Sequence, residues 1–239
     1  RLSAHGVQIV LASGRRHENL IRFHAELGLS GPTISGNGAL VRDTARDEPW
    51  HEQLLDSKHV DTLLADGFGR GMTQVIEHAD GGSYLHETTR HSDILAHRTG
   101  NPMTVRAHFH GIDRTKVRKV IWIADPDVVE AAAPVQRSHW NGKLEVLVTD
   151  PEYLEYMAPG VDKVHALRVV AERCAVPREQ VLAFGDGGND VAMLRWAGCG
   201  IAMAHGWEIA LAAADRVAPA GDPADAFARA VDALLADFG

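Results

Sequence analysis

Cysteine is nearly absent from this chain: Cys174 and Cys199 are the only two among 239 residues. Cys174 lies within an apolar helical pattern and Cys199 directly precedes an apolar segment, so the two do not form a spaced cysteine framework. This composition argues against a disulfide-stapled secreted domain and favours a reducing compartment. We therefore expect the protein to be cytoplasmic.

Long hydrophobic runs and an excess of basic charge are also missing. The longest apolar runs, such as Val7–Ala12 and Val181–Phe184, are far shorter than the ~20 residues that cross a bilayer. The chain has 24 basic and 32 acidic residues, a formal net charge of −8, whereas nucleic-acid binding needs clustered Lys and Arg. We predict no membrane span and no nucleic-acid partner, and a small molecule or metal as the ligand.

Strand and helix signals alternate at both ends of the chain. A strand over Val7–Ala12 leads through Ser13-Gly14-Arg15 into a helix over about 16–27. In the last third, strands at 181–184 and 200–203 alternate with helices at about 163–175, 191–197, 207–214 and 223–235. This rhythm predicts an α/β fold with a doubly wound parallel sheet covered on both faces.

Residues 46–148 show a different pattern. Their predicted strands alternate apolar and polar side chains, which is typical of a sheet with one covered face; they lie at 73–77, 83–88, 105–110, 120–124 and 144–149. Helices are expected near Val60, Asp93 and Val128. We interpret 46–148 as an inserted α/β domain, and 1–45 with 149–239 as the core domain.

The strongest chemical signal is Gly185-Asp186-Gly187-Gly188-Asn189-Asp190, which follows the strand at 181–184. Two carboxylates and an amide would converge at the carboxyl edge of the sheet, where doubly wound folds bind ligands. Carboxylates this close repel one another unless a cation or proton lies between them, and hard oxygen ligands suit Mg²⁺. Asp186 and Asp190 are therefore candidate metal ligands, with Asn189 beside them. The alternative is that Asp186 caps a turn and Asn189 or Asp190 is only a helix N-cap.

Three further positions could bind an anion. Lys163 begins a predicted helix, where a cation opposes the macrodipole by ~0.3–1 kcal/mol and a bound phosphate would compensate; alternatively it is a surface lysine or pairs with Asp162. Ser13 and Gly14 precede a helix and could offer a hydroxyl and N–H groups, or simply form a turn with a serine N-cap. Asn37 lies in a Gly-Asn-Gly turn, where left-handed geometry explains Asn without a ligand.

Together these sites resemble the haloacid dehalogenase-like hydrolases, specifically the Cof-type phosphatases with a large α/β cap. The matching segments follow the family's order along the chain: Leu11–Arg15, Asn37–Ala39, Gly160–Lys163, Gly185–Asp190 and Ala197–Ala204. The resemblance implies a Rossmann-like core, an α/β cap and Mg²⁺-dependent hydrolysis of a small phosphorylated metabolite, such as a sugar phosphate or phosphorylated cofactor, through an aspartyl-phosphate.

The resemblance also implies roles for the candidate residues. Asp186 would hold Mg²⁺ and Asp190 would ligate it or orient its surroundings. Lys163, Ser13 and Asn189 would stabilise charge on the phosphoryl oxygens, with Gly14 and Asn37 at the bound substrate.

The family's first motif, Asp-x-Asp-Gly-Thr, does not occur in these residues, and no aspartate precedes Asp43. That motif supplies the attacking aspartate and the acid/base aspartate on a central first strand, whose removal would leave buried backbone groups unpaired at ~1–3 kcal/mol each. We expect the natural protein to carry an upstream segment with this motif. One alternative is a genuinely shortened chain. The other is a non-catalytic protein that lacks the nucleophile and serves to bind a phosphorylated metabolite or as a regulatory protein.

The predicted cap offers one further set of candidates. Arg106, His108 and His110 would share one face of a strand at 105–110. If the open face of the cap sheet covers the active site, as the resemblance implies, these three contact the substrate. The chain has fourteen histidines, but no cysteine pair or other zinc ligands accompany them at the spacing of a zinc site. We therefore predict no zinc site. The sequence contains no recognisable code for the substrate's identity or the oligomeric state.

Overall fold

The computed structural model describes residues 2–100 and 103–236. They form two compact units: a terminal unit within residues 1–10 and 162–239, and a central unit within residues 11–161. The predicted domains place their boundaries elsewhere, at 45/46 and 148/149, and that division stays a prediction. Cys174 and Cys199 are not joined by a disulfide, and no helix within the described ranges is long and apolar enough to cross a membrane.

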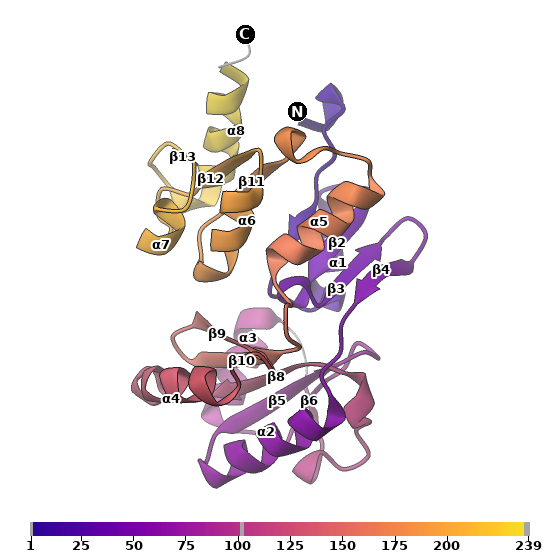
Figure 1. The fold of residues 1–239 in the computed structure, drawn as a ribbon, viewed down its shortest axis with the longest axis vertical. Coiled ribbons are helices and arrows are strands. Elements are labelled where there is room, and N and C mark those ends of the chain that lie inside the picture. The colour runs from indigo at the N-terminus through magenta and orange to yellow at the C-terminus, as the bar shows by residue number, and fades with distance from the viewer. Residues whose placement is uncertain (1, 101–102, 237–239) are drawn as a thin grey trace. The chain divides into compact units, whose positions relative to one another are not determined.

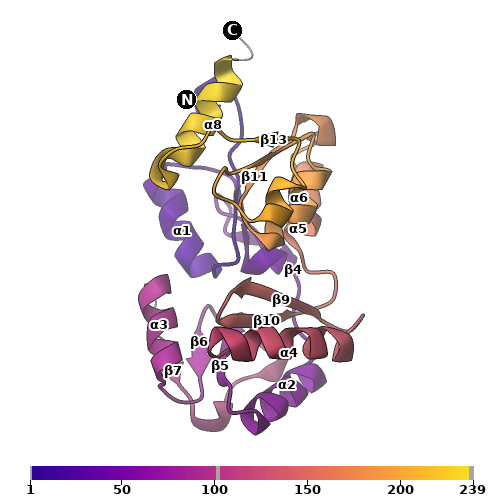
Figure 2. The same ribbon diagram turned by 90° about the vertical axis from the view of Figure 1, so that its left-hand side faces the viewer.

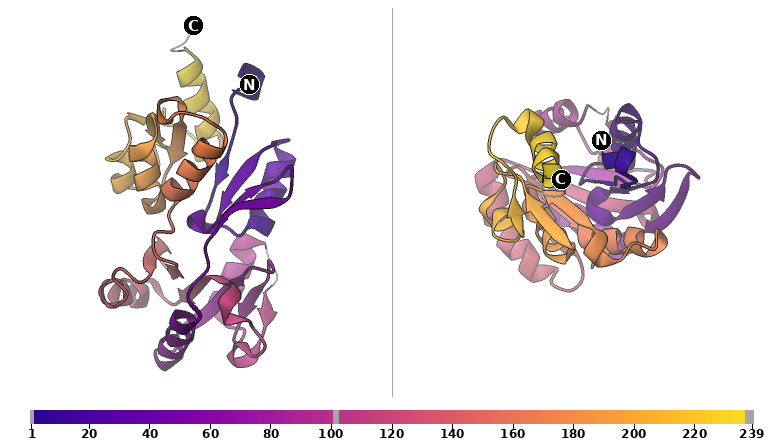
Figure 3. Two further views of the ribbon diagram at one scale, coloured as in Figure 1. Left: turned by 45° about the vertical axis from the view of Figure 1, so that its right-hand side comes forward. Right: turned by 90° about the horizontal axis from the view of Figure 1, so that it is seen from above.

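The central unit begins with a four-stranded sheet in the order β1-β2-β3-β4. The strands are β1 (Leu11–Ala12), β2 (Pro32–Ser35), β3 (Leu40–Asp43) and β4 (Glu48–Glu52), with β1 parallel to β2 and the other pairs antiparallel. Helix α1 (His17–Glu26) connects β1 to β2 and contacts β2; Figure 3 shows this part from two further directions. The 3₁₀ turn η2 (Gly36–Gly38) joins β2 to β3.

The predicted buried strand at 7–12 is wrong except for its last two residues. Only Leu11 and Ala12 are in a strand, and Val7 is 41% exposed. A strand forms where a neighbour supplies backbone hydrogen bonds, and within the described residues β1 pairs with β2 alone.

The larger sheet of the central unit has the order β7-β6-β5-β8-β10-β9. Its strands are β5 (Thr73–His78), β6 (Ser83–Leu85), β7 (Thr104–Val105), β8 (Val117–Ile123), β9 (Glu145–Asp150) and β10 (Tyr153–Met157). Helices α2 (Ser57–Gly69) and α4 (Pro126–His139) pack on one face through Ile76, Val120, Trp122, Leu154 and Tyr156. Helix α3 (Arg90–Thr99) packs on the other through Leu95, Val75, Ile121 and Ile123, as Figure 1 shows.

The terminal unit contains a parallel sheet of β11 (Leu182–Gly185), β12 (Cys199–Ala202) and β13 (Arg216–Val217) in that order. Helix α8 (Ala226–Ala236) packs on one face through Ile201, Met203, Ala230 and Leu234. Helices α5 (Lys163–Arg173) and α6 (Val191–Trp196) lie on the other face, as Figure 2 shows. Helix α7 (Glu208–Leu211) follows β12, and short 3₁₀ turns complete the unit: η1 (Leu2–His5), η5 (Arg178–Gln180) and η7 (Pro223–Asp225). The predicted α/β class is confirmed.

The predicted strand at 105–110 is wrong. Strand β7 ends at Val105, and the 3₁₀ turn η3 (Ala107–Phe109) follows; a second turn, η4 (Arg114–Lys116), leads into β8. His108 and Phe109 have φ of 50° and 53°, in the left-handed region. The turn places the Phe109 side chain in the core, where it is 1% exposed. Arg106, His108 and His110 therefore do not share a strand face.

Candidate active site

The loop after β11 is wound around the carboxylate of Asp190. β11 ends at Gly185, and the 3₁₀ turn η6 (Gly188–Asp190) leads into α6. The backbone N–H groups of Asp186 and Gly187 donate to Asp190 Oδ2 at 2.9 and 3.0 Å. A Cβ atom added at Gly185 would lie 2.5 Å from Asp190 Cβ, so this close approach requires glycine. The sequence motif thus folds as one locally determined loop, with Asn189 half-buried within it.

Lys163 binds the other oxygen of Asp190. Its Nζ donates to Asp190 Oδ1 at 2.6 Å, and the two side chains are 8% and 5% exposed. Asp162 is the N-cap of α5 and accepts the N–H of His165 instead. Both alternatives for Lys163, a surface lysine and a pair with Asp162, are therefore wrong. The Lys163 ammonium group is therefore held at the loop by a buried ion pair.

Asp186 differs from Asp190 in having an exposed carboxylate. Its side chain is 61% exposed, and His205 Nε2 lies 3.9 Å from its Oδ2. Asp186 therefore fits an oxygen ligand of Mg²⁺, whereas the two oxygens of Asp190 already accept protein donors and fit a role in holding the loop. Across residues 2–100 and 103–236 no group of three or more His, Cys, Asp or Glu side chains could hold a metal. Within the loop at 185–190, Asp186 is thus the exposed carboxylate.

The central unit holds the other phosphate-site candidates on two turns that are bonded to each other. Ser13 N–H donates to Ile34 O at 2.9 Å, and Asn37 N–H donates to Ser13 O at 3.0 Å. Ser13 Oγ accepts the N–H of Arg15 at 3.1 Å, which confirms the Ser-Gly turn. The N-cap of α1 is Arg16, so the predicted serine N-cap is wrong.

Asn37 has the left-handed backbone predicted for its turn, with φ 57° and ψ 22°. Its side chain is buried, and Nδ2 donates to Glu155 Oε2 at 2.8 Å. A Cβ added at Gly14 would lie 2.8 Å from Asn37 Oδ1, so the two turns also pack tightly. The asparagine serves both the turn geometry and a buried hydrogen bond.

Sequence reasoning missed three buried charged residues behind these turns. Lys119 on β8 is 2% exposed, and its Nζ lies 3.0 Å from Gly14 O, 3.1 Å from Glu155 Oε1 and 3.4 Å from Glu77 Oε2. Glu155 on β10 and Glu77 on β5 are 7% and 13% exposed. The available signal was a charged residue within an apolar strand, as in Val117–Ile123 and Tyr153–Met157.

The charges of this cluster are unequal, with two carboxylates around one ammonium. Burial raises the pKa of Glu77; Lys119 opposes this change and Glu155 adds to it. Burial alone would lower the pKa of Lys119, but Glu155 and Glu77 outweigh it and raise that pKa above its ordinary value. Lys119 therefore stays charged, while Glu77 takes up a proton more readily than a free glutamate.

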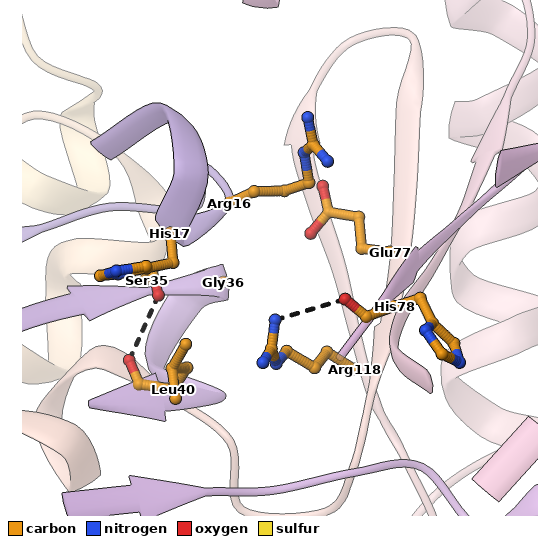
Figure 4. A pocket seen from close by; sticks show the side chains of 8 residues that line it. All are labelled: Arg16, His17, Ser35, Gly36, Leu40, Glu77, His78 and Arg118. Carbon is orange, nitrogen blue, oxygen red and sulfur yellow. Dashed lines mark hydrogen bonds between the residues drawn. The ribbon is translucent and has the colours of Figure 1, made fainter. Parts of the chain in front are cut away.

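A small cavity in the central unit borders this cluster (Figure 4). Arg16 and Glu77 point toward one another in it, and Arg118 donates to His78 O at 3.3 Å. Burial lowers the pKa of His17, with Arg42 and Arg118 in the same direction and Glu18 opposing. The cavity is lined by Arg16, His17, Ser35, Gly36, Leu40, Glu77, His78 and Arg118, none of which sequence reasoning had selected.

The structure gathers the predicted site residues into one group per unit. Asp186, Asn189 and Asp190 lie in the loop at 185–190 of the terminal unit, and Lys163 at the start of α5 is bonded to Asp190. Ser13, Gly14 and Asn37 lie in the paired turns of the central unit. Arg106, His108 and His110 are exposed, with the N–H of His108 donating to His86 Nδ1 at 2.8 Å. Their predicted contact with substrate depended on a shared strand face. Because that strand does not form, this prediction has no structural support.

Comparison with known proteins finds relatives that are named as phosphatases or as haloacid dehalogenase-like hydrolases. The 5-amino-6-(5-phospho-D-ribitylamino)uracil phosphatase YitU of Bacillus subtilis (strain 168) is 24% identical over 214 residues, covering 86% of this chain and 77% of that protein. A haloacid dehalogenase-like hydrolase from Bacteroides thetaiotaomicron superposes with a TM-score of 0.85 at 25% identity, covering 98% of this chain and 89% of that one.

A second solved structure, the HAD subclass IIB sugar phosphatase BT4131, has a TM-score of 0.81 at 20% identity and covers 97% of this chain and 87% of that one; at that identity it supports the fold alone. The family profile described as haloacid dehalogenase-like hydrolase matches residues 1–231. Because that match spans nearly the whole chain, the chain belongs to the haloacid dehalogenase-like hydrolases.

Proposed function

We propose that this chain belongs to a cytoplasmic, Mg²⁺-dependent phosphatase that hydrolyses a small phosphorylated metabolite, such as a sugar phosphate or a phosphorylated cofactor. The observation that carries the proposal is the loop at 185–190, which holds both the exposed carboxylate of Asp186 and the buried carboxylate of Asp190, the latter paired with Lys163 of α5. The name of one similar protein, a phosphoribitylaminouracil phosphatase, supports a small phosphorylated metabolite as the substrate class.

The candidate residues of the two groups have distinct proposed roles. Asp190 holds the loop and orients Lys163, and Asp186 would hold Mg²⁺, which when bound neutralises charge on the phosphoryl oxygens. Lys163, Asn189 and the hydroxyl of Ser13 stabilise the remaining negative charge, since preorganised donors need no rearrangement during the reaction. Gly14 and Asn37 position the phosphate-binding turn.

The proposal also includes the domain roles and the covalent route. Residues 1–45 with 149–239 would form the core, and residues 46–148 a cap that excludes water and selects the substrate. The resemblance implies attack on phosphorus by an aspartate of an Asp-x-Asp-Gly-Thr motif, which these 239 residues do not contain. The roles proposed for Ser13, Lys163 and Asp186 do not include that of the attacking aspartate.

The test measures phosphate release by the intact protein from a panel of sugar phosphates and phosphorylated cofactors, with Mg²⁺ and with a chelator. We expect Mg²⁺-dependent turnover that Asp186→Asn lowers by at least about 100-fold. Asp127→Asn is the matched control, because Asp127 is exposed at the start of α4 in the central unit; it should match the wild type. Undiminished turnover in Asp186→Asn would refute the metal assignment. Phosphate-ester binding without turnover in the wild type would instead favour a non-catalytic binding protein.

A further inference from the structure

Four residues of the central unit form a closed ring of contacts behind the Ser13–Gly14 turn. Lys119 Nζ donates to Gly14 O at 3.0 Å and to Glu155 Oε1 at 3.1 Å, and Asn37 Nδ2 donates to Glu155 Oε2 at 2.8 Å. The Asn37 side chain closes the ring by packing against Gly14, leaving no room for a Cβ there. The ring thus joins both turns to two neighbouring strands, β8 and β10.

The strands hold Lys119 in a rigid setting. Lys119 lies directly opposite Glu77 across the β5–β8 pair, and Glu155 lies opposite Ile121 across the β10–β8 pair. Because side chains alternate along a strand, Lys119, Glu77 and Glu155 share one face of the sheet. An ammonium group held between two buried carboxylates has little freedom to move, so its third contact, to Gly14 O, is also fixed.

The contact at Gly14 O reaches Ser13 through a single peptide plane. Gly14 C=O and Arg15 N–H belong to the same planar unit, and that N–H donates to Ser13 Oγ at 3.1 Å. Fixing the carbonyl oxygen therefore fixes the direction from which Ser13 Oγ receives its hydrogen bond. The hydroxyl's own proton is then left to donate elsewhere.

We infer that Lys119 is a positioning residue, which orients the hydroxyl of Ser13 through the Gly14–Arg15 peptide, and that Glu155 links it to Asn37. This inference depends on the proposed function, since it gives that hydroxyl an anionic partner, a phosphoryl group. Lys119 itself acts through the turn and does not touch the substrate. Its role is distinct from burial of charge for stability, which would leave the turn unaffected.

The experiment compares the intact wild type with three variants. Lys119→Met removes the donor but leaves two buried carboxylates, so it can fail to fold. The charge-free variant Lys119→Met/Glu77→Gln/Glu155→Gln removes every charge of the cluster and keeps an acceptor for Asn37, so it avoids the unpaired charge. Lys143→Met is the matched control, because Lys143 is exposed in the same unit.

Two measurements decide the outcome. With p-nitrophenyl phosphate and Mg²⁺, we expect the charge-free variant to lose about 100-fold in kcat with a much smaller change in KM. Amide hydrogen exchange at residues 13–15 and 36–37 should be at least about tenfold faster than in the wild type, and Lys143→Met should be unchanged in both. Unchanged kcat in an active protein, or unchanged exchange of these amides, would overturn the inference. If the wild type releases no phosphate, the proposed function fails and the inference fails with it; wild-type turnover with an unchanged kcat in the charge-free variant overturns the inference alone.

Discussion

Replacing Lys163 by methionine should strongly destabilise the terminal unit. The Lys163–Asp190 pair is 2.6 Å long and both side chains are at least nine-tenths buried. Removing one partner of such a pair costs about 3–5 kcal/mol, because the other charge stays buried without a counter-ion. The two N–H groups on Asp190 Oδ2 remain and reduce that cost without replacing the ammonium. A solvated lysine at a helix start would instead give a gain of ~0.3–1 kcal/mol on removal, so the sign of the change separates the two interpretations.

The assay is urea unfolding followed by amide hydrogen exchange of peptides from α5 and α6, which reports on the terminal unit. The assay compares the wild type with four variants: Lys163→Met, Asp190→Asn, the double variant and the control Lys143→Met. The double variant should recover most of the loss, since no unpaired charge remains buried. The reasoning is refuted if Lys163→Met lies within about 0.5 kcal/mol of Lys143→Met or is more stable than the wild type.

Three further predictions address the other groups. Mg²⁺ should raise the thermal unfolding midpoint of the wild type and leave that of Asp186→Asn unchanged, because Asp186 is the free carboxylate of its loop; an equal rise in both would contradict this. Gly14→Ala should lose about 1–3 kcal/mol, since its Cβ would lie 2.8 Å from Asn37 Oδ1, whereas Gly69→Ala, with open space around it, should lose nothing in the same denaturation series. Burial raises the pKa of Glu77 above its ordinary 4.5, so the folded state binds the extra proton and loses stability as pH rises through the folded pKa. The stability of Glu77→Gln relative to the wild type should therefore increase from pH 4 to pH 8, measured as the free energy of unfolding in urea. A difference in unfolding free energy that does not change with pH would count against the raised pKa.

Local chemistry explains which parts of the site could be predicted. The loop at 185–190 depends on contacts within five residues: Asp190 accepts two N–H groups from its own turn, and Gly185 leaves it room. Asn37 needs only the left-handed geometry of its own turn. Such features follow from residue type and spacing, and the motif therefore predicted them.

Contacts between distant residues explain what could not be predicted. Lys163 pairs with Asp190, 27 residues away, while the near neighbour Asp162 caps the helix instead. The alternation at 105–110 is typical of a strand, yet burial of Phe109 in the core favours a turn with φ of 53°. Periodicity reports only the neighbours along the chain, and here the tertiary core decided the backbone conformation.

The charges of the loop at 185–190 also determine what it can bind. Lys163 contributes one positive charge and Asp186 and Asp190 two negative ones, so the group is anionic overall. Because the Lys163–Asp190 pair is satisfied internally, the surplus negative charge resides on the exposed Asp186. An anion such as phosphate would be repelled there unless a cation neutralises Asp186 first. Under the proposed function, the loop would therefore bind phosphate together with a divalent cation, while the buried pair holds the Lys163 ammonium group in place.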